Sequence, residues 1–176
     1  MTSLRRFFVL MLAVAMAPLA GCATAAKPQA MAVQTVPAAT SVNENLKAAM
    51  RVADVTGGKN TNPLWTSQVD AAGFKTALEQ SLRVAGYMAP SADAARYVIS
   101  ANLKKLDQPI LGLTFDVTSS IDYRVTNAED TRNFPITATG SAGVGDAFFG
   151  VERLRLANEN SINENIKAFL KALSNY

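Results

Sequence analysis

Apolar and polar residues alternate along four segments of this 176-residue chain. The clearest alternation covers residues 113–126, where every second side chain is apolar or small, and it predicts a strand with one buried face. Shorter alternations predict three more strands, over residues 46–53, 97–104 and 134–142. Turn-forming residues at 127–130 separate the last two strands, so we expect these two strands to form a hairpin.

Two other segments have apolar residues at helical spacing. The first predicts a helix over residues 69–85, with Ser67 or Asp70 able to cap its start and Gly86 suited to its end. The second predicts a long closing helix over residues 151–173. The order β-α-β-β-β-α favours an α+β two-layer sandwich, in which two helices pack on one face of an antiparallel sheet of about four strands.

The N-terminus has a different pattern. Arg5 and Arg6 precede an unbroken apolar run from Phe7 to Ala17, and this run is shorter than the about 20 apolar residues that a membrane-spanning helix needs. Residues 1–21 are therefore predicted to be a signal peptide. The run leads into Leu19-Ala20-Gly21-Cys22, which resembles the lipobox of bacterial lipoproteins and contains the only cysteine of the chain.

The lipobox resemblance implies cleavage between Gly21 and Cys22 and conversion of the Cys22 thiol to a diacylglyceryl thioether. Two or three acyl chains, such as palmitate, give stable anchoring because each buried CH₂ adds about 0.8 kcal/mol of membrane affinity. The alternative, a secretory signal followed by a free cysteine, would leave an exposed thiol in an oxidising compartment. Ala23, in the place where aspartate favours inner-membrane retention, implies the periplasmic face of the outer membrane.

Residues 22–44 lack a sustained period and contain Pro28 and Pro37. This composition predicts a flexible tether after the lipidated Cys22, with a root-mean-square reach of about 25 Å. A first strand within Met31–Val36 is the alternative. Residues 45–176 are then expected to form a single domain of ordinary length.

The amino-acid composition excludes several classes of catalytic and binding site. The chain has no histidine, so Ser-His-Asp and Cys-His catalysis and zinc sites built on His or Cys are excluded. An all-oxygen metal site stays open, although no EF-hand-like loop is present. Loss of Arg5 and Arg6 with the signal leaves 15 basic residues against 14 acidic ones. The pair Lys104-Lys105 makes no basic patch, so we expect no nucleic-acid partner.

Three local motifs could suggest catalysis or nucleotide binding, and each is weak. The glycine-rich segments 140–145 and 57–59 lack the βαβ context and the Walker spacing of nucleotide-binding loops. Asp116 and Asp122 lie six residues apart on one strand, or about 20 Å, which is too far for joint acid-base work. No Ser-x-x-Lys motif is present. We therefore expect a non-enzymatic protein without cofactor or metal.

Two regions are candidate contacts with a partner. Phe148 and Phe149 lie among glycines before the last helix, where one ring is expected to pack as a staple and the other to stay at the surface. Burial of both rings under loops is the alternative. Trp65 either covers the core or contacts a partner. A further candidate, for which a solvated surface is the favoured interpretation, is the polar sheet face with Thr114, Thr118, Asp122 and Arg124.

Several features beyond the lipobox match one known family. They are the Phe74–Ala85 helix that closes on Gly86-Tyr87, the alternating strand 113–125, the junction 145–149 and the final helix with Asn160-Ser161-Ile162 and Phe169-Leu170. In this layout the chain resembles the YajG-type outer-membrane lipoproteins, and its general plan is similar to that of the lipopolysaccharide-assembly lipoprotein LptE. The resemblance implies a fold and a location, and it implies no reaction.

We therefore predict a lipid-anchored, non-enzymatic lipoprotein on the periplasmic face of the outer membrane. It would contact the membrane through the acyl chains on Cys22 and would serve as an interaction or envelope-assembly module with an envelope protein as partner. The alternative is a carrier or binder of a lipid or glycolipid.

Overall fold

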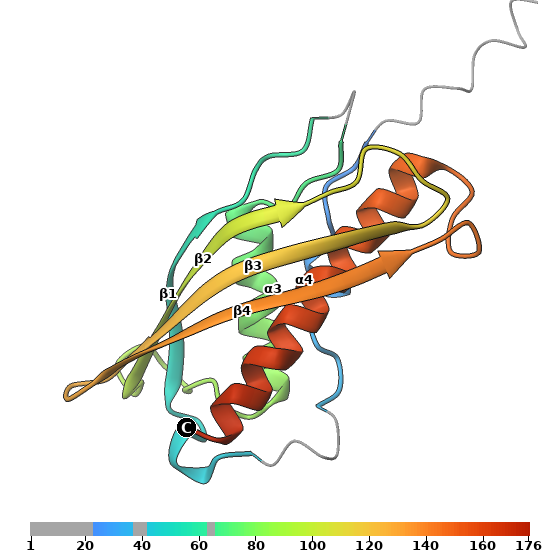
Figure 1. Ribbon diagram of the computed structural model, residues 1–176. Helices are drawn as coiled ribbons and strands as arrows, with labels where there is room; N and C mark the ends of the chain where they lie inside the picture. The colour runs from blue at the N-terminus through green and yellow to red at the C-terminus, as the bar shows by residue number, and fades with distance from the viewer. Residues whose placement is uncertain (1–22, 37–41, 63–65) are drawn as a thin grey trace, which may run out of the picture.

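The computed structural model describes residues 23–36, 42–62 and 66–176. One four-stranded sheet is covered on one face by helices, which confirms the predicted α+β two-layer sandwich (Figure 1). The main elements are β1 (Met50–Gly57), α3 (Ala71–Val84), β2 (Tyr97–Asp107), β3 (Phe115–Thr126), β4 (Thr131–Ala142) and α4 (Gly150–Ser174). Two short helices precede them, α2 (Pro28–Met31) and the 3-10 helix η1 (Glu44–Leu46).

The sheet is mixed, with the strand order β1-β2-β3-β4. β3 pairs antiparallel with both β2 and β4, as expected, but β1 pairs parallel with β2. The prediction of a fully antiparallel sheet is therefore wrong for its first strand. The reason is the crossover helix α3, which returns the chain to the level at which β1 began, so that β2 runs in the same direction.

Two strands, β1 and β3, begin later than the alternation predicted, whereas β2 begins at the predicted residue and β4 begins three residues earlier. Residues 46–49 precede β1, because η1 ends at Leu46 and Ala48 has a positive φ of 48°. Leu46 is nevertheless fully buried, and so it fits the apolar pattern without belonging to the strand. Leu113 likewise lies outside β3 and is 75% exposed.

Both long helices lie where the helical spacing predicted them. The Asp70 carboxylate accepts a hydrogen bond of 2.8 Å from the amide of Gly73, which caps α3. Gly86, with a φ of 75°, follows the end of this helix. α4 spans 25 residues and packs across β3 and β4.

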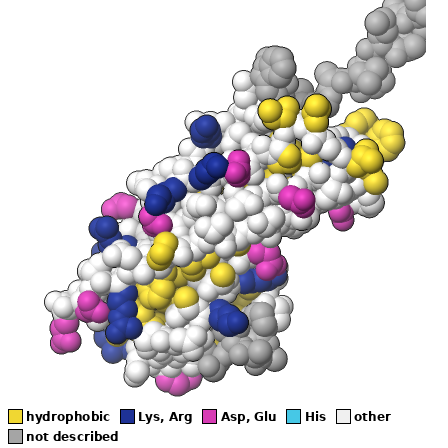
Figure 2. All heavy atoms as spheres, in the orientation of Figure 1, with side chains coloured by type: hydrophobic (Ala, Val, Ile, Leu, Met, Phe, Trp, Pro, Cys, Tyr) yellow, Lys and Arg dark blue, Asp and Glu magenta, His cyan; other side chains and the backbone are white. Residues whose placement is uncertain are grey.

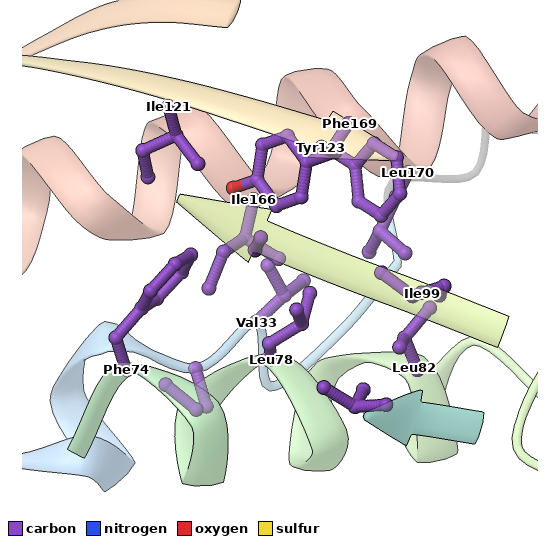
Figure 3. Close-up of a cluster of buried hydrophobic side chains, with 14 of the residues drawn as sticks. Val33, Phe74, Leu78, Leu82, Ile99, Ile121, Tyr123, Ile166, Phe169 and Leu170 are labelled. Carbon is purple, nitrogen blue, oxygen red and sulfur yellow. The ribbon is translucent and has the colours of Figure 1, made fainter. Parts of the chain in front are cut away.

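The core lies between the sheet and the helices (Figure 3). The Tyr123 ring stacks on the Phe169 ring with centroids 4.0 Å apart, and the edge of Phe74 meets Tyr123 at 6.2 Å. A smaller apolar cluster lies near the start of α4 and consists of Phe115, Val117, Ala142, Leu154 and Ala157. Close packing of both clusters fixes α4 against the sheet.

Residues 23–36 are packed, whereas they were predicted to belong to a flexible tether. The Val33 amide donates to Ser81 Oγ of α3 at 2.9 Å, and Asn163 of α4 donates to the Ala32 carbonyl at 2.8 Å. Met31, Ala32 and Val33 are buried between the two helices, where Figure 3 draws Val33 beside the α3 side chains. The segment also contains the short helix α2 in place of the alternative strand. Its apolar residues lack a period because they fill an irregular gap.

Among the helices of the described ranges, none combines the length and the apolar character needed to cross a membrane.

Candidate functional site: an exposed apolar end

Two connections meet at one end of the molecule, residues 108–114 between β2 and β3 and residues 143–149 between β4 and α4 (Figure 1). They carry six large apolar side chains with exposed fractions from 59% to 93%, and Figure 2 shows hydrophobic side chains projecting there. These residues, which we call the apolar end, are Ile110, Leu111, Leu113, Val144, Phe148 and Phe149. Exposed large apolar side chains gathered at one end in this way mark a candidate place of contact with another molecule or a membrane.

Phe148 and Phe149 are both exposed, at 86% and 64%. Their rings meet edge to face with centroids 5.4 Å apart. The expected staple against the last helix is therefore absent, and so is the alternative in which both rings are buried. The reason is that Arg153 occupies the space beneath the loop, with its guanidinium 5.4 Å from the centre of the Phe115 ring.

Arg153 ties the two loops together. Its Nη1 donates to the carbonyls of Ala147 and Phe148 at 3.1 and 2.7 Å, and its Nη2 donates to the carbonyl of Gly112 at 3.4 Å. The residue is only 8% exposed. Within the described residues its Nε has no hydrogen-bond partner and its guanidinium forms no ion pair with a carboxylate. A cation this buried without a counter-charge is unusual.

A groove opens beside Arg153, between residues 109–112 and the first turns of α4, with a volume of about 630 Å³. Apolar side chains form most of its wall, and they include Ile110, Leu111, Phe115, Val151 and Leu154. The groove therefore combines apolar walls with one guanidinium, which suits an amphiphile better than a polar metabolite.

The described chain begins at this same end (Figure 1). The Ala26 amide donates to the carbonyl of Gln68 at 3.2 Å, and the Gln68 side chain donates to that of Gln108 at 3.0 Å. Gln108 is the first residue after β2, where the loop of the apolar end starts. Residue 26 is thus linked through Gln68 to Gln108, which lies two residues before Ile110 in the loop of the apolar end.

A buried charge cluster also fixes this part of the chain. The Glu159 carboxylate accepts a hydrogen bond of 2.7 Å from the Lys27 amide and pairs with Arg155. Arg155 and Glu159 are 5% and 2% exposed. Arg155 also pairs with Glu152, and this hydrogen bond is the main reason why the pKa of the Glu152 carboxyl is lowered. The cluster is a structural tie and lies within α4 and the N-terminal segment.

Other candidates from the sequence have structural explanations or lie outside the described residues. Gly21, Cys22 and Trp65 fall outside the described ranges. Gly140 lies in β4 under α4, where a Cβ atom would come within 2.1 Å of the Ser161 amide nitrogen, so the glycine permits close packing. Gly57 has a φ of 78°, which agrees with a turn at the strand end.

The polar sheet face is paired across its strands. Asp122 contacts Lys104 at 3.0 Å, and the hydroxyls of Thr118 and Thr139 lie 2.8 Å apart. A shallow depression of about 520 Å³ on this face is lined by residues such as Asp54, Asn102, Asp122, Arg124 and Asn133. Asp116 interacts with Ser141 instead of sharing a site with Asp122. In the part of the chain that the structure describes, no group of three His, Cys, Asp or Glu residues is arranged to hold a metal ion.

No protein-family model matches this sequence, and no curated protein matches it either. Among solved structures, the fold is similar to that of a Caulobacter crescentus CB15 protein described as a "putative lipoprotein", with a TM-score of 0.50 and 11% identity over 75% of this chain and 92% of that one. The hypothetical protein CT253 from Chlamydia trachomatis matches with a TM-score of 0.44 and 10% identity, over 72% and 93% of the two chains. At these identities the likeness concerns the fold alone.

Proposed function

We propose that this protein is a lipid-anchored lipoprotein of the periplasmic face of the outer membrane, and that it acts by contact and not by catalysis. The observation that carries the proposal is the position of the lipobox-like sequence relative to the fold. Cys22 immediately precedes Ala23, the first described residue of the segment that packs between α3 and α4. Cleavage before Cys22 would thus leave in place the packed segment that contains Lys27, Ala32 and Val33.

The chemistry of the chain supports a non-enzymatic role. The chain has no histidine, and its only cysteine is the predicted lipid attachment site. The described carboxylates that were weighed as catalytic groups, Asp116 and Asp122, interact with Ser141 and Lys104 on an exposed face. The fold likeness to the Caulobacter protein agrees with a lipoprotein and suggests no reaction.

The contact surface of this proposal is the apolar end, with Phe148 and Phe149 at its tip. The alternative is a carrier of a lipid or glycolipid, and the groove of about 630 Å³ beside Arg153 is the observation that favours it. The space between the helices and the sheet is a poorer lipid site, because the side chains of Phe74, Tyr123 and Phe169 fill it.

Fractionation together with intact mass tests the anchor. We expect the wild-type protein in the outer-membrane fraction after density separation, with the added mass of acyl chains on Cys22. The matched control carries a secretory signal peptide in place of residues 1–22, so that the exported chain starts at Ala23. This control should appear in the soluble periplasmic fraction. A wild-type protein that is soluble and has no acyl mass would contradict the proposal.

Native mass spectrometry of the same soluble control separates the two roles. A contact module should give the mass of the protein alone. Co-purified lipid, seen as an added mass that is lost when the exposed groove residue Ile110 is changed to Glu, would favour the carrier.

A further inference from the structure

Chain length limits how far the anchor can lie from the apolar end. Ala26 is held by Gln68 and Lys27 by Glu159, so only four peptide units separate the predicted lipid-bearing Cys22 from a fixed backbone position. At about 3.3–3.6 Å per residue, the acyl chains attach within about 14 Å of Ala26. The bilayer that receives them must therefore lie close to the end of the domain that carries the exposed apolar side chains.

The loops of the apolar end have the composition of a membrane-seeking surface. Segments 108–114 and 143–149 contain one charged residue, Asp146, whose carboxylate accepts a hydrogen bond of 2.8 Å from the Gly143 amide. Surface loops of water-soluble domains are usually polar, whereas Phe, Leu and Ile side chains next to a lipid anchor gain by entering the acyl boundary. Several apolar side chains at one end strengthen membrane binding together, because the burial of each one contributes to the affinity.

Arg153 gives a second, independent indication. It lines the groove behind the apolar side chains, is more than nine-tenths buried, and has an Nε without a hydrogen-bond partner in the described structure. Among the described residues, no carboxylate forms an ion pair with this guanidinium. Lipid phosphate groups carry the negative charge that the Arg153 guanidinium lacks, and they lie one layer above the acyl boundary.

We propose that the apolar end inserts into the same bilayer that holds the acyl chains, with its apolar side chains at the acyl boundary and Arg153 at the level of the lipid phosphates. This inference rests on the proposed lipid anchor, which brings the bilayer to this end. The bilayer is favoured over a protein partner because the anchor fixes its position, whereas nothing in the described structure fixes that of a protein.

The test uses the full acylated protein, because acylation consumes the only native thiol. A single cysteine is introduced at Leu111 (Leu111→Cys) and labelled with an environment-sensitive fluorophore, and the protein is reconstituted into vesicles of phosphatidylethanolamine with a minority of phosphatidylglycerol. The matched control is Ala128→Cys, in the exposed β3–β4 hairpin at the other end of the molecule (Figure 1). Thermal unfolding of both variants checks that the fold is intact.

At position 111 we expect blue-shifted emission, quenching by spin-labelled lipid and about tenfold or greater protection from aqueous iodide, as burial of a leucine-sized side chain implies. Position 128 should remain accessible to iodide. Equal accessibility at the two positions in acylated protein would overturn the insertion and leave the anchor intact. Protection at position 111 that grows with the protein-to-lipid ratio would overturn it in favour of contact between copies. If Cys22 itself takes the label, the anchor fails, and the insertion fails with it.

Discussion

The backbone amide of Lys27 donates a hydrogen bond of 2.7 Å to the carboxylate of Glu159, which joins the start of the described chain to the last helix across 132 residues of sequence. Because Glu159 is 2% exposed and also pairs with the buried Arg155, the N-terminal segment depends on an ion pair inside the protein. Its position is therefore sensitive to changes in that pair.

Replacement of Glu159 by Gln should lower the free energy of unfolding by about 2–3 kcal/mol. This is less than the roughly 3–5 kcal/mol typical of a broken buried pair, because Arg155 keeps its contact with Glu152. Urea unfolding measures the change. The matched control is Glu164→Gln, which removes an exposed pair with Lys167 and should cost less than about 0.5 kcal/mol. Equal effects of the two substitutions would contradict the structural role of Glu159.

Asn165 is a buried polar link between α4 and the sheet. Its Oδ1 accepts a bond of 2.9 Å from the Tyr123 hydroxyl, and its Nδ2 donates to the carbonyls of Ser119 and Ile136. Asn165→Ala should cost about 2–3 kcal/mol of unfolding free energy, because it leaves buried polar atoms unpaired. A double-mutant cycle with Tyr123→Phe, measured by urea unfolding, should show a favourable coupling between the two side chains. Strict additivity would argue against this hydrogen bond.

The Glu152 carboxyl should make the free energy of unfolding depend on pH in the acidic range. Its hydrogen bond with Arg155 lowers its pKa below the ordinary 4.5, so the folded state favours the charged form. The stabilisation is fully present above the unfolded-state pKa and is lost as pH falls from about 4.5 through the lower folded-state pKa. Urea midpoints measured from about pH 6 down to about pH 3 should fall less steeply in Glu152→Gln than in the wild type. Parallel profiles would count against this pair.

Phe148 and Phe149 should contribute to contact and little to stability. Because both rings are exposed, the double change Phe148→Ala and Phe149→Ala should alter the unfolding free energy by less than about 0.5 kcal/mol. The double change should also lower the yield of in-cell crosslinks between the protein and the molecules that the apolar end contacts. Phe169→Ala is the control for a buried ring and should cost about 3–5 kcal/mol. Unfolding of the double variant would show that the two rings support the fold.

Arg153 should order the loops of the apolar end. Arg153→Ala removes the donors to the carbonyls of Gly112, Ala147 and Phe148, so hydrogen exchange and limited proteolysis at residues 108–114 and 143–149 should become faster. The matched comparison is Arg132→Ala, which removes an exposed pair with Asp130 at the opposite hairpin. If these two segments exchange hydrogen and are cleaved in Arg153→Ala at the wild-type rates, the loops are ordered by their own packing and not by Arg153.

Local periodicity predicted most of the fold because the sheet buries one face and each helix buries one stripe. The helix from Ala71, the hairpin between β3 and β4 and the element order follow from this rule. Strand direction does not, since alternation is the same in parallel and antiparallel pairs, and so the parallel pairing of β1 was missed. A crossover helix of 14 residues between two strands was the signal that could have indicated it.

The candidate site was harder to predict for a different reason. Phe148 and Phe149 were identified, but Ile110 and Leu111 were not, because two loops far apart in sequence form one surface only after the sheet is assembled. Arg153 was missed since nothing local distinguishes it from the neighbouring charged residues of α4. The packing of Met31 and Val33 could not be deduced from a period, because these side chains fill a gap between two helices.

The packed N-terminal segment also limits how far the domain can extend from the membrane. A flexible segment of residues 22–44 would have let the domain search a hemisphere about 25 Å in radius. Because residues 26–33 are held against the helices, the reach of the domain from the membrane is set by the length of α4. Its 25 residues extend about 37 Å from the apolar end to the C-terminus. If the protein is lipid-anchored, the domain therefore stays within about one α4 length of the membrane surface, and it can contact only molecules that enter this layer.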